Sequence, residues 1–268
     1  MKEEIKRVFF ALEVVSPWPE EYPKGRILDI ACRHLTLAFL GNIPFQKLKG
    51  ALNSFPLVPP KIGLVGQFEK CLFLPERHPN VAAWKVNWWD DDQNLNNFQK
   101  MLAQWIRSLN FDISLRDDFL PHVTICRSPH IFKEWKDSFS PLPMMTKDLH
   151  LYESLGNSQY KPIWSLSIKS PFREIEHVAD IAFRINGEDL TQIQNHAIAA
   201  LAFKSPMLLN YLPEMATPTS LDDIIIFLNE LITNADKEMG CPFKAASFHG
   251  NLIEEIDLTL SWEMIVDV

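Results

Sequence analysis

Alternating apolar and polar residues predict two strands that share one short pattern. His34-Leu35-Thr36-Leu37 and His122-Val123-Thr124-Ile125 both read His-x-Thr with apolar residues interleaved. Side chains two residues apart share one face of a strand. Each stretch therefore predicts a strand with an apolar, buried face and an imidazole beside a hydroxyl on the opposite face.

Periodicity elsewhere in the first 170 residues predicts both strands and helices. Further strands are predicted at 6–15, 61–68, 71–75, 81–88, 146–153 and 163–169, and helices from Pro44 to Phe55, at 93–109 and at 131–138. These elements lack the regular alternation of a parallel doubly wound fold, and the repeated His-x-Thr unit suggests an internal duplication. We therefore expect an α+β domain of two pseudo-symmetric lobes with antiparallel sheets. The acidic run Asp90-Asp91-Asp92 is interpreted as negative charge at a helix N-terminus rather than as a metal site.

The pattern changes at Lys169-Ser170-Pro171, where a proline interrupts a strand. Beyond it we predict a turn-strand-turn over 172–187, helices at 189–203 and 221–238, and strands at 243–249 and 252–267, with Thr219 or Ser220 capping the second helix. The chain of 268 residues is therefore predicted to form two domains, 1–170 and a smaller α+β domain at 171–268.

The net charge of the chain also changes sign near residue 170. Residues 171–268 hold 5 Lys+Arg against 16 Asp+Glu, a net charge of -11, which leaves +3 for residues 1–170. An acidic chain is a poor candidate for nucleic-acid binding as a whole, but a mildly basic first domain can hold a phosphate-binding cleft. Chance surface composition is the alternative explanation.

Composition indicates a cytoplasmic globular protein with no membrane partner. Hydrophobic residues make up 47% and charged residues 22%, and no apolar run is long enough to span a bilayer. The N-terminus Met1-Lys2-Glu3-Glu4 carries no signal-peptide pattern. The 4 cysteines are widely spaced and form no C-x-x-C pair, which fits a reducing compartment and argues against a zinc ribbon.

The two histidines are candidates for acid–base chemistry. A single histidine in an apolar strand is more often structural, but the duplicated pattern favours a site. Because histidine titrates near neutrality, a pair can hold one neutral and one protonated ring together.

Four segments in the first domain resemble the two-histidine (2H) phosphoesterases, in particular the RNA 2',3'-cyclic phosphodiesterase or 2'-5' RNA ligase branch. They are VFFAL at Val8–Leu12, HLTLAFLG at His34–Gly41, PHVTICR at Pro121–Arg127, and LYES at Leu151–Ser154 followed by Tyr160.

The resemblance implies hydrolysis of RNA 2',3'-cyclic phosphate ends to a 2'-phosphomonoester. It implies that His34 donates a proton and that His122 accepts one and activates water. Thr36 and Thr124 would hydrogen-bond the phosphoryl oxygens. Arg127 suits phosphate, although a salt bridge is equally open to it.

No metal is expected for this reaction, since no carboxylate cluster accompanies the histidines. Tyr160 or Trp164 is expected to stack on a base. Two other functions remain open: 2'-5' ligation at the same site, and a non-catalytic module that binds RNA ends or a ligase.

The second domain resembles archease, the accessory protein of the GTP-dependent tRNA-splicing RNA ligase. The matching segments are EHVAD at Glu176–Asp180, FLNEL at Phe227–Leu231, KAASFH at Lys244–His249 and IVDV at Ile265–Val268. The domain is shorter than the family norm, because strands between the second helix and Lys244 are missing. The resemblance implies a ligase partner.

The archease resemblance also implies a divalent cation, calcium or magnesium, held by Asp180, Asp267 and the carbonyl of Val268. Oxygen-only ligands suit such ions. The alternative is that both acids are exposed strand ends. His177 and His249 are expected to be structural hydrogen-bonding residues rather than zinc ligands.

Overall fold

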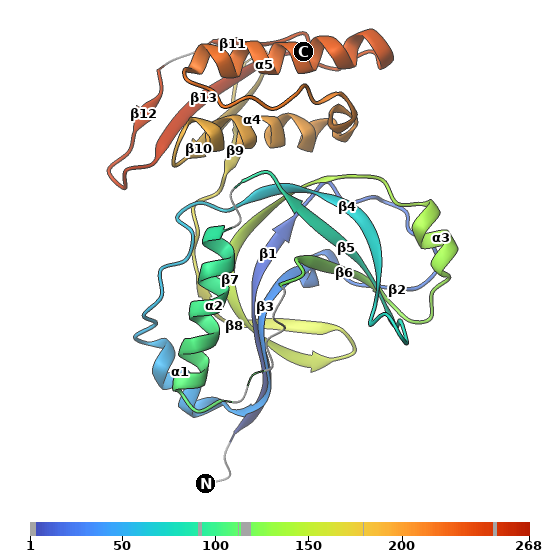
Figure 1. Cartoon of the computed structure of the whole chain (residues 1–268), viewed down its shortest axis with the longest axis vertical. Coiled ribbons are helices and arrows are strands. Elements are labelled where there is room, and N and C mark those ends of the chain that lie inside the picture. Colours follow the sequence, from blue (N-terminus) through green and yellow to red (C-terminus); the bar gives the residue numbers. More distant parts are fainter. Residues whose placement is uncertain (1–3, 91–92, 112, 114–118, 179, 249–250) are drawn as a thin grey trace.

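The structure is a computed structural model, and it describes all residues except 1–3, 91–92, 112, 114–118, 179 and 249–250. The chain forms two α+β units that lie one above the other (Figure 1). Each unit is built on one sheet whose named strands pair in antiparallel fashion, as the sequence predicts.

Within the described residues, the first unit contains eight strands and three α-helices. The strands are β1 Ile5–Val15, β2 Arg26–Ile27, β3 His34–Pro44, β4 Val65–Leu74, β5 Val81–Trp88, β6 His122–Arg127, β7 Pro143–Gly156 and β8 Gln159–Leu166. The helices are α1 Phe45–Leu52, α2 Gln93–Ser108 and α3 Phe132–Asp137, and a 3-10 turn covers Ile30–Cys32.

The sheet of the first unit closes on itself. Its order is β1-β3-β6-β5-β4-β7-β8, and β1 also pairs with β7, so six strands form a ring (Figure 1). The two lobes expected from the duplicated motif therefore share one continuous sheet. A core that includes Phe10, Leu35, Phe98 and Val123 is buried between this sheet and the helices α1 and α2, which cover one flank.

The two His-x-Thr strands are neighbours in the ring. β3 and β6 pair at Leu35 and Val123. In an antiparallel register this pairing sets His34 across from Thr124 and Thr36 across from His122. Leu35 and Val123 are fully buried, whereas the His and Thr side chains lie on the opposite face, as the alternation predicts.

The second unit begins with β9 at Phe172. Its elements are β9 Phe172–Ile175, β10 Ile181–Gly187, α4 Leu190–Lys204, a 3-10 helix Pro206–Tyr211, α5 Leu221–Met239, β11 Ala245–Phe248, β12 Ile253–Glu254 and β13 Leu260–Asp267. The sheet order is β11-β13-β10-β9, with β12 at the edge of β13. The predicted single strand within 172–187 is thus two strands, and the predicted 252–267 strand is interrupted by a turn. Ser220 caps α5 in a reciprocal capping box with Asp223, in agreement with the sequence.

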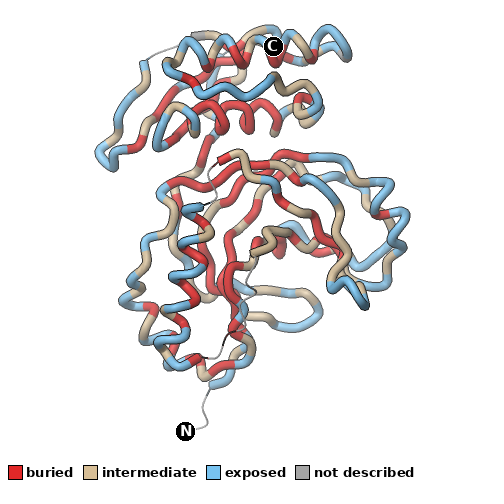
Figure 2. The backbone as a smooth tube through the Cα atoms, in the orientation of Figure 1, coloured by how far each residue is buried: buried red, intermediate tan, exposed pale blue. Residues whose placement is uncertain are grey.

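Helix α4 is buried on all sides. It contacts β10 and β13 of its own unit and β4 and β7 of the first unit, and ten consecutive residues from Ile193 to Ala202 are buried. Figure 2 shows this helix as a continuous buried segment between the units. Val65 and Met145 from the first sheet belong to the core of the second unit, so the two units pack through an apolar junction.

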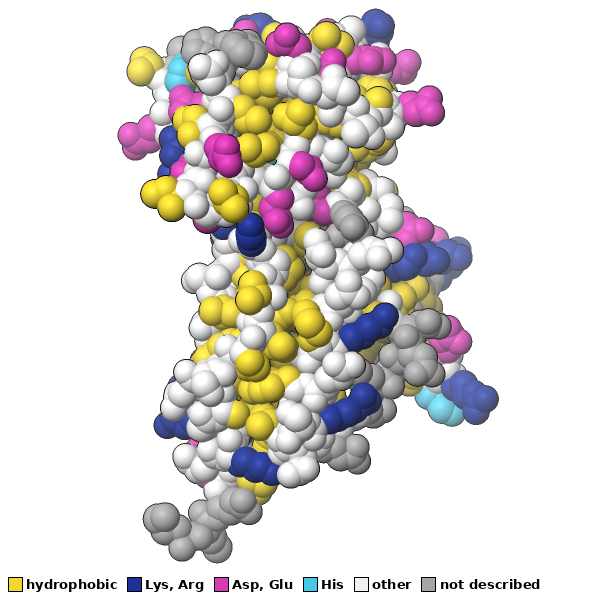
Figure 3. All heavy atoms as spheres, turned by 60° about the vertical axis from the view of Figure 1, so that its left-hand side comes forward, with side chains coloured by type: hydrophobic (Ala, Val, Ile, Leu, Met, Phe, Trp, Pro, Cys, Tyr) yellow, Lys and Arg dark blue, Asp and Glu magenta, His cyan; other side chains and the backbone are white. Residues whose placement is uncertain are grey.

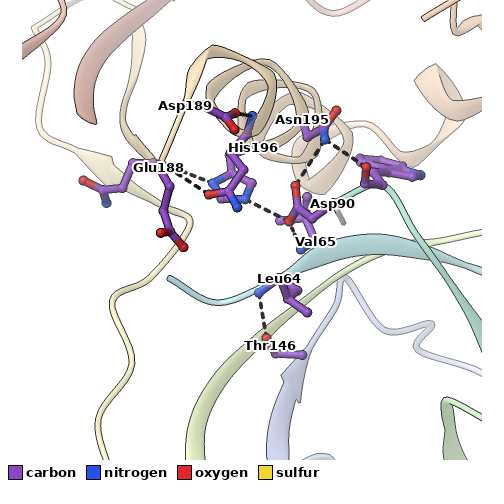
Figure 4. A network of polar contacts seen from close by, with 11 residues as sticks. Leu64, Val65, Asp90, Thr146, Glu188, Asp189, Asn195 and His196 are labelled. Carbon is purple, nitrogen blue, oxygen red and sulfur yellow. Dashed lines mark hydrogen bonds and ion pairs between the residues drawn. The ribbon is translucent and has the colours of Figure 1, made fainter. Parts of the chain in front are cut away.

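A buried polar network crosses this junction. The Asp90 carboxylate accepts the backbone N–H of Val65 at 2.8 Å and lies 3.0 Å from Nε2 of His196 on α4. Asn195 Nδ2 donates to the other Asp90 oxygen at 3.1 Å, and His196 Nδ1 contacts the carbonyl of Asn186 (Figure 4). Each ring nitrogen of His196 therefore has a hydrogen-bond partner within the network.

The network gives the first residue of the acidic run a buried partner that the sequence did not predict. Asp90 is not a solvent-facing charge at the start of α2, because only 1% of its side chain is exposed and His196 pairs with it. Asp91 and Asp92 lie outside the described residues. Among the described helices, none is both long and apolar enough to cross a lipid bilayer.

Candidate active site

Both histidines of the repeated motif are held by the same local contact. His34 Nδ1 lies 2.8 Å from the carbonyl oxygen of Cys32, and His122 Nδ1 lies 2.8 Å from that of Leu120. Because a carbonyl only accepts, each Nδ1 must carry the proton and donate it. This fixes the ring orientation and makes Nε2 the nitrogen that can take or give a proton.

One cleft of about 820 Å³ brings the predicted site residues together. His34, His122, Thr36, Thr124 and Arg127 all line it. They come from β3 and β6, which pair with each other at Leu35 and Val123. Two histidines and two threonines on one face can surround a single tetrahedral anion.

An aromatic wall surrounds His34. Its ring centroid lies 4.7 Å from that of Phe9, 5.5 Å from that of Tyr152 and 5.0 Å from that of Tyr160, with Tyr160 edge-on. The pKa of His34 is lowered to about 4, mainly by burial; the hydrogen bond to the Cys32 carbonyl opposes the shift, and the nearby charges of His122 and Arg127 contribute to it. In the free protein His34 is therefore neutral at pH 7.

Arginines give the cleft its charge. Arg7 and Arg26 line it with Arg127, and Arg127 donates to the Tyr160 hydroxyl at 3.3 Å. Of these three arginines, only Arg127 was predicted from the sequence pattern. Strand alternation could have found Arg7, which shares a face with Phe9 on β1, whereas Arg26 is placed by the pairing of the two-residue strand β2 with β6.

The two aromatic candidates for base stacking lie in different places. Tyr160 lines the cleft. Trp164 does not: its ring packs against Phe10 and Phe55, with centroids 6.1 and 4.9 Å apart, on the core side of the sheet. The prediction is wrong for Trp164, because the β7–β8 pairing shifts register between Tyr152–Pro162 and Leu151–Trp164, and this irregularity breaks the alternation that would otherwise put Trp164 on the face of Tyr160.

The residues predicted to bind a cation lie at the ends of two adjacent central strands of the second sheet. Ile181 on β10 pairs with Val266 on β13, so Asp180 and Asp267 are neighbours across the two strands. Lys244 Nζ donates to the Val268 carbonyl, which places a positive charge on the third predicted ligand. Among the described residues, no group of three or more His, Cys, Asp or Glu could hold a metal ion.

The remaining histidine predictions of this unit concern structural contacts. His177 Nδ1 lies 3.4 Å from the backbone nitrogen of Asp180 and 3.8 Å from its carboxylate. A hydrogen-bonding role for His177 fits this geometry. His249 lies outside the described residues.

Comparisons with known proteins give only weak likenesses. No family model and no curated protein matches the chain. Among solved structures, E. coli LigT complexed with 3'-AMP is 21% identical with a TM-score of 0.45, and the match covers 62% of this chain and 99% of that one. A structure described as a phosphoesterase is 20% identical (TM-score 0.45; coverage 62% and 99%), and TT0787 of Thermus thermophilus is 18% identical (TM-score 0.44; coverage 61% and 98%). Such values give no ground for assigning a function to this chain.

Proposed function

We propose that the cleft hydrolyses a 2',3'-cyclic phosphate at the end of an RNA by two-histidine acid–base catalysis. One observation carries this proposal: two histidines with the same Nδ1 anchor line one cleft with two threonines and three arginines. A singly anionic, strained diester matches such a cleft, because its phosphoryl oxygens need donors and its reaction needs one base and one acid.

The steps follow from these groups. His122 takes a proton from water as the water oxygen attacks phosphorus, and the bond from phosphorus to the 3' oxygen breaks. His34 gives that oxygen a proton, which leaves a 2'-phosphomonoester and a 3' hydroxyl. Thr36, Thr124 and Arg127 hold the phosphoryl oxygens.

The low pKa of His34 makes substrate binding part of this mechanism. A neutral ring cannot donate the required proton, but a phosphate anion beside it favours the charged form. The anionic substrate therefore raises the pKa of His34 when it binds, so that the ring takes up from solvent the proton that it then donates.

The test is an assay on a short RNA that ends in a 2',3'-cyclic phosphate, in excess chelator. No carboxylate lines the cleft among the described residues, so turnover should persist. His34→Gln and His122→Gln should each lose at least about a hundredfold in rate, the usual contribution of a general acid or base. His78→Gln, at an exposed residue outside the cleft lining, is the matched control.

Other outcomes identify the alternatives. Tight RNA binding without product would contradict the proposed enzymatic activity and would favour a module that only binds RNA ends. Adding an RNA with a 5' hydroxyl to the same assay measures ligation, the reverse chemistry. Support of a tRNA-splicing RNA ligase by the second unit stays a prediction from the sequence resemblance.

A further inference from the structure

The cleft extends beyond the residues that are proposed to act on the phosphate. Its volume of about 820 Å³ lies towards the upper end of the range for small-ligand sites. Besides the two His-x-Thr motifs, its lining includes Phe39 of β3 and Arg7 of β1. The proposed reaction uses neither side chain in a chemical step. The cleft therefore has room, and two unassigned side chains, for a part of the substrate beyond the reacting phosphate.

A β-bulge turns Phe39 into the cleft. Strict alternation along β3 would place Phe39, three residues after Thr36, on the opposite, buried face. The pairing of β3 with β1 instead shifts by one residue at Leu37, so that Phe39 lies across from Phe9. Bulges re-aim side chains in this way near functional sites. Phe39 consequently lines the cleft beside Phe9, with 46% of the residue exposed to solvent.

A buried helix residue supports this bulge. Gln99 of α2 donates from Nε2 to the carbonyl oxygen of Leu37 at 3.2 Å. A bulged residue leaves ladder groups unpaired, and a buried carbonyl without a partner would be destabilising. Gln99 supplies that partner, so helix α2 stabilises the backbone feature that exposes Phe39.

Phe39 continues the aromatic wall that surrounds His34. The Phe9 ring centroid lies 4.7 Å from that of His34 and 6.3 Å from that of Phe39, and the two phenylalanine rings are stacked. The guanidinium of Arg7 lies over the Phe39 ring, 5.1 Å from its centroid. Proteins hold single-stranded nucleic acids with this combination, because bases stack on aromatic rings while cations bind the backbone phosphates.

The direction of this row follows from the strand that carries Arg7 and Phe9. β1 runs from the Arg7 end, near the start of the chain, to Val15, which packs against the core of the second unit (Figure 1). The second unit carries a net charge of -11, and Figure 3 shows the acidic side chains gathered on that unit. A nucleic-acid strand that leaves the two histidines along Phe39 and Arg7 therefore moves away from charge that would repel it.

We propose that Phe39 and Arg7 form a subsite for the nucleotide that precedes the cyclic-phosphate nucleotide of an RNA. This subsite rests on the proposed function, since a 2',3'-cyclic phosphate ends the strand and leaves every other phosphate on its 5' side. Three strand residues, about 10 Å, separate Thr36 from Phe39. That distance suits the preceding base, whereas Tyr160 beside His34 remains the expected partner of the terminal base. The preceding base stacks on Phe39, and a backbone phosphate binds Arg7.

The test compares two substrates, adenosine 2',3'-cyclic phosphate and the dinucleotide ApA that ends in the same group. Wild type should have a kcat/KM at least about tenfold higher for the dinucleotide, the gain expected from one base–aromatic stack. Phe39→Leu keeps an apolar side chain but cannot stack, and Arg7→Gln loses the cation, so each should lower this ratio at least about threefold. Phe132→Leu is the matched control, because it removes a ring that is also 46% exposed but lies outside the cleft lining. It should leave the ratio unchanged.

A binding measurement separates this subsite from the proposed reaction. If wild type turns over neither substrate, the proposed function fails, and calorimetric titration with 2'-AMP and with ApA 2'-phosphate tests the subsite alone. The dinucleotide should bind at least about tenfold more tightly, and Phe39→Leu should remove the difference. The subsite is overturned if wild type treats mononucleotide and dinucleotide alike in the assay used, if Phe39→Leu or Arg7→Gln leaves the ratio unchanged, or if Phe132→Leu lowers it equally.

Discussion

The two motif histidines share an anchor but differ in surroundings. A backbone carbonyl two residues upstream orients each ring through Nδ1. Three aromatic rings surround His34, and burial against them lowers its pKa to about 4. Burial therefore favours the neutral form of His34 in the free protein, and the proposed role of proton donor requires the anionic substrate to reverse that preference.

The His34 pKa gives a prediction that NMR can check. In the free protein the ring should titrate near pH 4, well below the usual 6.5. Because the unfolded chain then binds more protons between these values, His34 should lower stability as pH falls from 6.5 towards 4. A nucleoside 2'-monophosphate should raise this pKa by adding negative charge. A His34 pKa near 6.5 in the free protein, or a pKa that does not rise with the nucleotide, would contradict the proposal that substrate binding protonates His34.

At the scale of elements, α4 joins the units. Most surface helices have one apolar face, but α4 is covered on both sides and places Gln194, Asn195 and His196 in the junction. These polar residues are tolerated because Asp90 and the backbone carbonyls of Trp89, Asn186 and Ala216 accept hydrogen bonds from their side-chain nitrogens. The helix therefore specifies how the two units dock.

Breaking the buried pair should be costly. Asp90→Ala leaves His196 and the Val65 N–H without their partner and should lower the free energy of unfolding by about 3–5 kcal/mol. Glu69→Ala is the matched control, since Glu69 pairs with Lys85 at 2.8 Å with 41% of its side chain exposed. That loss should stay within about 1 kcal/mol. Urea unfolding of both variants measures the difference, and equal losses would show that the network does not stabilise the junction.

The predicted cation site lies at the ends of the paired strands β10 and β13. We predict that calcium or manganese binds the full chain and that Asp180→Ala abolishes binding, because both carboxylates are needed to replace the ion's water. Lys244→Ala should tighten binding, since it removes a competing positive charge from the Val268 carbonyl. Calorimetric titration tests all three proteins. Binding that is absent, or equal in wild type and Asp180→Ala, would remove the site.

On the scale of the whole molecule, the proposed catalytic cleft and the junction between the two units lie in different places. The cleft is lined only by residues of the first unit among those described. The junction buries Val65 and Met145 of that unit against the core of the second. Catalysis is therefore expected to need only the first unit, while stability depends on both.

A chain ending at Lys169 tests this division. It should fold and open cyclic-phosphate RNA at the rate of the full chain, because every proposed catalytic residue remains. Its melting temperature should be lower, since Asp90 loses His196 and apolar surface is exposed. In this shortened chain Asp90→Ala should cost much less than in the full chain. An insoluble or inactive product would place the domain boundary elsewhere.

The sequence alone determined the properties that depend on local order. Alternation set the buried and exposed faces of β3 and β6, and Ser220 with Asp223 marked the start of α5, because strand pleat and helix capping involve residues only a few positions apart. Tertiary structure decided what depends on distant partners. Periodicity identifies a face but not the residues that will meet it, so only the folded chain shows Asp90 paired with His196 106 positions away, Arg26 brought to the cleft and Trp164 turned into the core.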